Sequence, residues 1–204
     1  MADILSLFGG SSDSIYDATV KECLDKRILI INDEINDDVI EAYIVQILKW
    51  NGEDKDIPEE KRSPIKIVIN SPGGDAIVGM GLVDVITQSK TKVVAIGIGL
   101  VASAAFHIYI SCHERYSFKN TIFLMHDGEI AIQNSSSKAR DTMDFFETME
   151  AQTKEHVLAH TTMDNAFYDK VWGSEFYMYP TKAKDFGVVD KIIGEDCDID
   201  ILFD

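Results

Sequence analysis

The sequence predicts an α/β fold with parallel strands, and three observations lead to this expectation. Short apolar runs that are typical of buried strands alternate with longer segments in which apolar residues recur every three or four positions. The connections between these segments are short. Polar motifs follow several of the strands directly, and in such folds ligands bind at the carboxyl ends of the strands.

The elements follow from the pattern in chain order. Apolar runs predict strands at 27–31, 65–69, 93–98 and 121–125. Helical spacing predicts helices at 37–50, 76–89, 138–160, 164–172 and 181–186. Residues 51–64 are charged and bounded by Gly52 and Pro64, which is typical of an exposed loop. Gly187 is expected to end the last helix before the apolar run VVDKII.

The most apolar stretch, residues 92–112, is long enough to raise the question of a membrane span. It holds no charged side chain after Lys92, and a span needs about 20 apolar residues. Its first half is a β-branched strand pattern that breaks at Gly97 and Gly99, and its second half resumes as a helix after Ser103. A buried strand, turn and helix explain both features, so no membrane association is expected.

Length and composition indicate one domain. The 204 residues suffice for a sizeable core. We expect a flexible N-terminal arm at 1–16, the folded domain at 17–193 and an acidic, solvated C-terminal tail at 194–204. The formal net charge of −16 argues against binding to nucleic acid, because phosphate backbones would be repelled.

Cysteine usage and the N-terminus favour a cytoplasmic protein. Cys23, Cys112 and Cys197 are widely spaced and odd in number, which indicates a reducing compartment. The start of the chain lacks the basic segment of a secretory signal. No metal or organic cofactor is expected, since the Asp196 to Asp200 segment lacks the glycine and glutamate of a calcium loop.

Ser103 and the SPGGD motif are the first candidates for chemistry. Ser103 lies at a predicted helix start, where free backbone N–H groups would stabilise an oxyanion, although a serine there also caps helices. Gly73 and Gly74 follow a strand and allow the backbone to approach a ligand closely, although such a motif is also an ordinary turn. A serine nucleophile needs both a base and oxyanion donors.

His126 is the candidate base, because it directly follows a predicted core strand. His107 lies four residues after Ser103 on the same helix, and such a pair seldom brings the imidazole onto the hydroxyl; a packing or oligomer-facing role is expected for it. His113, His156 and His160 are expected to be surface histidines. Composition does not select a carboxylate for the third position of a triad.

Four motifs in order, INSPGGDAIVGMG, GLVASAAF, MHDGE and KAKDFGVVDKI, resemble the proteolytic subunit of the Clp protease, the serine peptidase family ClpP. The resemblance spans about residues 14–193. It implies a ClpP/crotonase-like spiral of repeated β-β-α/β-α units, a single domain with a protruding long helix. The sequence departs from the family pattern in SAAF, in EIAIQNSSS after the histidine, and in a longer connection at 49–64.

Carried over by position, the resemblance implies that Ser103 is the nucleophile and His126 the general base. Counting back from FGVVD, it implies Glu175 as the acid, where the family usually has Asp, with Asp169 as the fallback. The oxyanion donors would be the backbone N–H groups of Gly73 or Gly74 and of Ala104.

The resemblance also implies a setting for this chemistry. A ClpP-like serine endopeptidase would assemble as a homo-oligomer of stacked heptameric rings, cleave unfolded polypeptides inside the chamber and receive them from an ATP-dependent unfoldase. Helix 138–160 would contribute to ring–ring contact and the N-terminal arm would line the entrance. The alternatives are a non-catalytic structural ring subunit and, less favoured, a crotonase-like acyl-CoA enzyme.

Overall fold

The computed structural model describes residues 15–133 and 135–202, and its centre is a seven-stranded sheet. Strands β1-β2-β3-β4-β7 lie parallel in that order, β5 pairs in parallel with β3, and β6 pairs antiparallel with β5. The strands are β1 (Ile28–Ile31), β2 (Ile65–Ser71), β3 (Val93–Ala102), β4 (Glu114–Phe118), β5 (Ile122–Met125), β6 (Phe176–Met178) and β7 (Lys191–Ile193). The predicted α/β class with parallel strands is confirmed.

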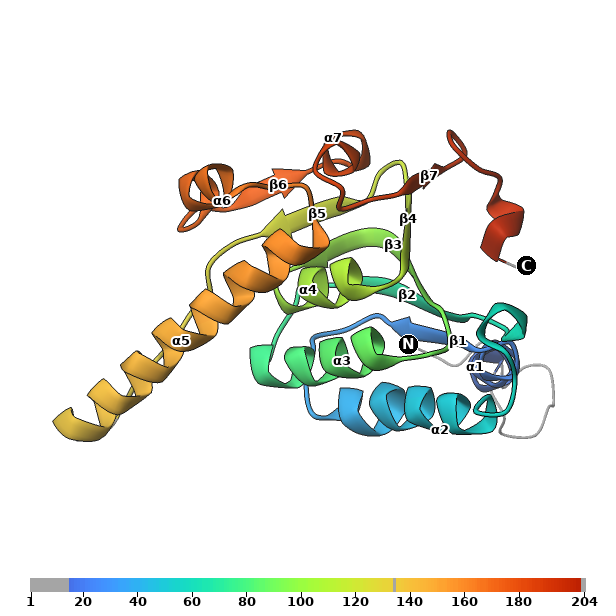
Figure 1. Ribbon diagram of the computed structural model, residues 1–204, viewed down its shortest axis with the longest axis horizontal. Helices are drawn as coiled ribbons and strands as arrows, with labels where there is room; N and C mark the ends of the chain where they lie inside the picture. The colour runs from blue at the N-terminus through green and yellow to red at the C-terminus, as the bar shows by residue number, and fades with distance from the viewer. Residues whose placement is uncertain (1–14, 134, 203–204) are drawn as a thin grey trace, which may run out of the picture.

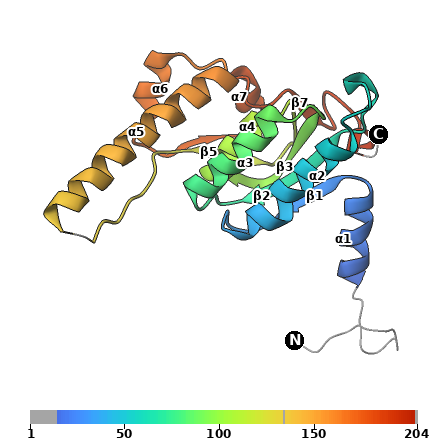
Figure 2. The same cartoon turned by 60° about the horizontal axis from the view of Figure 1, so that its bottom comes forward.

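Helices cover one face of this sheet, and one of them leaves the body of the molecule. Figure 1 shows α2, α3 and α4 side by side, while α5 projects away from the sheet; Figure 2 shows the same projection from another side. The α-helices are α1 (Ile15–Asp25), α2 (Val45–Glu53), α3 (Ala76–Gln88), α4 (Ala104–Ser111), α5 (Ser136–His160), α6 (Asn165–Val171) and α7 (Pro180–Asp185). A π-helical turn η2 (Ile40–Ile44) precedes α2, and 3-10 turns form η3 (Glu59–Lys61) and η4 (Ile199–Leu202).

Strand β3 is longer than expected, and this length positions the site. Its first half, Val94 to Gly97, pairs with β4, and its second half, Leu100 to Ala102, pairs with β5. Between the halves Gly99 has φ +63°, and the side-chain oxygen of Asn70 accepts a hydrogen bond from the Leu100 N–H at 3.0 Å. The glycine is therefore a bend within the strand rather than its end, and β3 delivers the chain to Ser103.

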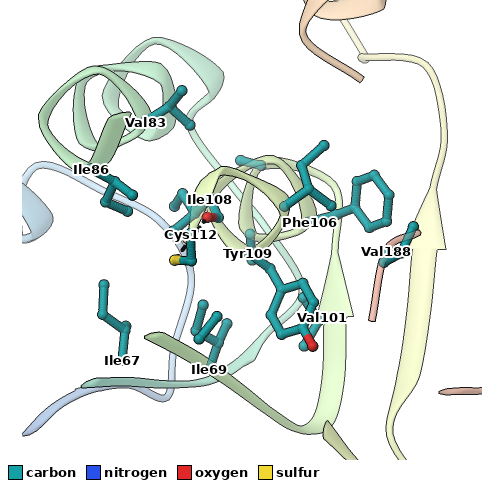
Figure 3. Packing of buried hydrophobic residues seen from close by; sticks show 14 of the residues in the cluster. Ile67, Ile69, Val83, Ile86, Val101, Phe106, Ile108, Tyr109, Cys112 and Val188 are labelled. Atoms are coloured by element: carbon teal, nitrogen blue, oxygen red, sulfur yellow. Dashed lines mark hydrogen bonds between the residues drawn. The ribbon is translucent and has the colours of Figure 1, made fainter. Parts of the chain in front are cut away.

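Helix α4 passes through the core, which explains the apolarity of residues 92–112. Phe106, Ile108 and Tyr109 are fully buried, and the Tyr109 hydroxyl donates a hydrogen bond to the Tyr116 carbonyl at 2.9 Å. Figure 3 shows Ile108 and Tyr109 of α4 among Val83 and Ile86 of α3 and Ile67 and Ile69 of β2. Across residues 15–133 and 135–202, no helix combines the length and the apolarity needed to cross a membrane.

The ends of the chain differ from expectation where the structure describes them. Cys197, Ile201 and Leu202 pack against a buried cluster on the other face of the sheet, so this part of the predicted solvated tail is folded. Asp196 accepts hydrogen bonds from the Lys184 ammonium and the Ile192 N–H. The predicted arm at 1–16 lies outside the described residues except for its last two, which begin α1.

Candidate active site

Ser103 stands at a strained turn between β3 and α4. Its backbone has φ 54° and ψ −124°, a conformation that non-glycine residues rarely adopt, and its N–H donates to the Leu124 carbonyl at 3.0 Å. Although Ser103 is the N-cap residue of α4, its side chain makes no capping hydrogen bond. The hydroxyl is therefore not engaged in capping its own helix, which was the alternative role for this serine.

The SPGGD turn packs directly against Ser103. Gly73 has φ +96°, and a Cβ added to it would lie 2.5 Å from the Ser103 Cβ and 2.8 Å from the Ala102 carbonyl oxygen. After the two glycines, Asp75 caps α3 by accepting hydrogen bonds from the Ile77 and Val78 N–H groups at 2.8 and 3.0 Å. Only glycine fits at position 73, because both its conformation and its contact with Ser103 exclude a side chain.

Two of the three predicted oxyanion donors remain free. The Gly73 N–H donates to the Ser71 hydroxyl at 3.1 Å. Within the described part of the chain, no hydrogen bond is found that uses the N–H of Gly74 or of Ala104. The Ala104 N–H also belongs to the first turn of α4, where the helix dipole favours negative charge. Of the three predicted donors, Gly74 and Ala104 are therefore the ones without a hydrogen-bond partner among the described residues.

A pocket joins Ser103 to His126. His126 follows the end of β5, which lies beside the second half of β3, and both side chains line the pocket together with His107. Its apolar wall comes from Met80, Phe146, Met149 and Trp172. Among the described residues, the two side chains form no hydrogen bond with each other. The fold thus brings the predicted nucleophile and base into one cavity.

Glu175 lies outside this cavity, at the edge of the sheet. Its exposed carboxylate accepts a hydrogen bond from the Tyr177 hydroxyl at 2.9 Å. In the antiparallel pair of β5 and β6 the last paired residues are Met125 and Phe176, and His126 and Glu175 are their immediate neighbours in the chain. The fallback acid, Asp169, lies on α6 and forms an ion pair with Lys154 on α5 at 2.5 Å.

His107 has one side in the core and one side on the pocket. His107 lines the pocket, and its Nδ1 atom is buried without a hydrogen-bond partner. Burial, followed by repulsion from His156 and His126, lowers the pKa of His107 to about 3. The expected packing or oligomer-facing role for His107 is therefore incomplete, because the ring also faces the cavity.

His156 and His160 are not the surface histidines that the sequence indicated. The His156 Nε2 atom lies 3.1 Å from the Ser111 hydroxyl, and its ring centroid lies 4.3 Å from that of His160. Burial, with repulsion from His160, lowers the pKa of His156 to about 4. A signal for their burial is present in the helical pattern, because His156 lies seven residues after Met149 and His160 lies three after Val157, on the apolar face.

The fold and the pocket define a class of protein. A serine at a strained strand-to-helix turn, with a histidine at the neighbouring strand end and free N–H groups beside it, is an arrangement that serine hydrolases use. A family model described as Clp protease matches residues 11–196. The chain therefore belongs to the Clp protease family, as a proteolytic-subunit homologue.

Individual comparisons agree with this assignment at low identity. ATP-dependent Clp protease proteolytic subunit 2 of Treponema denticola is 28% identical over 178 residues, which cover 86% of each chain. Proteolytic subunit 2 of Thermobifida fusca is 24% identical over 187 residues, 91% of this chain and 89% of the relative. A solved structure of a ClpP1 mutant from Listeria monocytogenes matches with TM-score 0.75 and 26% identity, over 89% of this chain and 98% of that one. The expected ClpP fold, with α5 as its long helix, is confirmed.

Proposed function

We propose that this chain is a serine endopeptidase that hydrolyses unfolded polypeptides, with Ser103 as nucleophile and His126 as general base. The observation that carries the proposal is the strained Ser103 turn, which packs against Gly73 and shares a pocket with His126. Strain of this kind persists only where the surrounding structure holds it, and it is frequent at catalytic sites.

The reaction follows from these positions. The Ser103 hydroxyl oxygen attacks the carbonyl carbon of a peptide bond, and His126 accepts the hydroxyl proton. The N–H groups of Gly74 and Ala104 hold the oxyanion, the C–N bond breaks, and His126 passes the proton to the leaving amine. Water then attacks the acyl-enzyme in the same way, releases the carboxylic acid and restores Ser103.

Glu175 is the proposed third member. The register of β5 and β6 supports it over Asp169, which is already paired with Lys154. To orient the imidazole, the Glu175 carboxylate would have to exchange its Tyr177 hydroxyl for the ring N–H of His126. We propose that this exchange accompanies assembly into rings, for which the projecting helix α5 supplies exposed apolar side chains, Met143 and Phe145.

The proposed setting is that of the family: stacked heptameric rings, an ATP-dependent unfoldase partner and a cytoplasmic location. The relatives named above are ATP-dependent Clp protease subunits, which supports the partner class. The site as proposed needs no metal or organic cofactor, because the hydroxyl, the imidazole and the backbone donors supply the chemistry.

A specific observation favours a second candidate, a non-catalytic ring subunit. In the described residues neither Ser103 with His126 nor His126 with Glu175 forms a hydrogen bond, and a subunit that only supports active partners needs neither contact. Hydrolysis of a fluorescein-labelled unfolded polypeptide by the purified chain, with Ser103→Ala as the control, separates the two. Hydrolysis that Ser103→Ala abolishes supports the peptidase; hydrolysis that persists in Ser103→Ala contradicts the assignment of the nucleophile.

A further inference from the structure

The pocket that contains Ser103 is also lined by a polar ring on the same helix, that of His107. His107 lies one turn beyond Ser103 along α4, and four residues of α-helix rise about 6 Å. A substrate side chain that reaches from Ser103 to His107 must therefore extend over about one helical turn. Met80, Phe146 and Met149 supply apolar lining to the same pocket. If Ser103 attacks a peptide carbonyl, as proposed above, the side chain next to that carbonyl is the one that enters.

The buried Nδ1 atom of His107 fixes which ring nitrogen carries the proton. A buried N–H donor without a partner is rarer in proteins than a buried acceptor without one. Nδ1 is buried and unpartnered, so we assign the proton to Nε2. Nε2 is not among the buried unpartnered atoms, and no described residue forms a hydrogen bond with it, while the half-buried ring lines the pocket. His107 therefore presents an N–H donor to the cavity.

The surroundings of His107 select against charged side chains. The Nε2–H of His107 is a donor, so it offers no acceptor to a lysine or arginine tip, which carries only N–H donors. An acidic tip would approach Glu150, which also lines the pocket, within a chain of net charge −16. A neutral hydrogen-bond acceptor remains.

We propose that His107 is the specificity-determining residue of this pocket, and that its Nε2–H donates a hydrogen bond to a neutral acceptor at the tip of a long substrate side chain, glutamine above all. This inference rests on the proposed peptidase function. The substrate residue that His107 recognises is the one whose carbonyl Ser103 attacks. The apolar stem of glutamine packs against Met80 and Met149, and its amide oxygen reaches the imidazole.

The experiment compares two fluorogenic peptides that differ only at the residue before the scissile bond, glutamine in one and norleucine, its apolar counterpart in length, in the other. We expect the wild-type ratio of kcat/KM, glutamine over norleucine, to fall about tenfold in His107→Leu, as for the loss of one hydrogen bond to a buried group. His107→Gln, which keeps an N–H donor, should restore part of the ratio. His156→Gln, outside the pocket lining, should leave it unchanged.

A binding measurement separates this inference from the peptidase proposal. On Ser103→Ala, calorimetry should give a lower Kd for the glutamine peptide than for the norleucine peptide, and His107→Leu should remove the difference. Binding preference without any hydrolysis by the wild type would contradict the peptidase proposal and support the role of His107. The role of His107 would be overturned if wild type and His107→Leu had equal kcat/KM ratios for the glutamine and norleucine peptides. It would also be overturned if the pocket preferred lysine and Glu150→Gln removed that preference.

Discussion

Replacing Gly73 by alanine tests how tightly the turn at Ser103 is built. An alanine at φ +96° costs about 1–3 kcal/mol of backbone strain. Its Cβ would also lie 2.5 Å from the Ser103 Cβ and 2.8 Å from the Ala102 carbonyl oxygen, both closer than real Cβ contacts, so backbone must shift. Because a displacement of about 1 Å at a reacting atom lowers rates roughly 100-fold, we expect Gly73→Ala to lose at least that factor in peptide kcat/KM.

Substitutions at two other glycines separate the effect of backbone strain from the effect of the Cβ clash at position 73. Gly194 has φ +88° with nothing within 4 Å of an added Cβ, so Gly194→Ala pays only the backbone strain. Gly52 lies in α2 with neither a positive φ nor a neighbour, and Gly52→Ala should stabilise the fold by about 0.5–1 kcal/mol. Urea denaturation ranks the stabilities, and peptide hydrolysis reports the site. Wild-type kcat/KM in Gly73→Ala would refute the packing argument, as would equal losses of stability in Gly73→Ala and Gly194→Ala.

Three further predictions concern the acid, pH and assembly. Glu175→Gln should lower kcat by more than 100-fold, while Asp169→Asn should change it less than threefold. The reverse order would assign the role of triad acid to Asp169 instead of Glu175. The pKa of His156 is about 4 in the folded chain, against an ordinary 6.5, so the unfolded chain takes up the proton at higher pH. The free energy of unfolding should therefore fall as the pH drops from about 6.5 to 4, by at most about 1.4 kcal/mol per pH unit. Urea titrations of His156→Gln should show a shallower decline, and an unchanged slope would contradict this cause. Phe145→Glu should shift the assembly to smaller species in light scattering, whereas an unchanged mass would exclude this part of α5 from the ring contact.

The sequence predicted the elements with strong periodicity, and it missed helix α1 and the short strands β4 and β6. Strands at 65–69 and 121–125 and the long helix at 138–160 were identified because burial imposes a regular apolar pattern on them. Strand β4 has the sequence ERYSF, and β6 has three residues, and both form because a neighbouring strand offers backbone partners. Pairing between distant segments leaves no local pattern.

The candidate site was predictable where chemistry coincides with a strand end. Ser103 and His126 followed from that rule, and the structure brings them to one pocket. Glu175 is different, because a count along the chain fixes its position in the sequence but not the direction of its carboxylate, which here accepts from Tyr177. The pocket face of His107 was also hidden, since an isolated helical pattern does not show which neighbour its side chain meets.

Labelling of Ser103 by a fluorophosphonate probe tests the central claim most directly. Intact-mass spectrometry of the assembled protein should show one phosphonyl group per chain, peptide mapping should place it on Ser103, and Ser103→Ala should remain unlabelled. His126→Ala should slow the labelling by several orders of magnitude, because the hydroxyl loses its base. An unlabelled Ser103, under conditions in which an active family member is labelled completely, would contradict the peptidase function and favour the non-catalytic ring subunit.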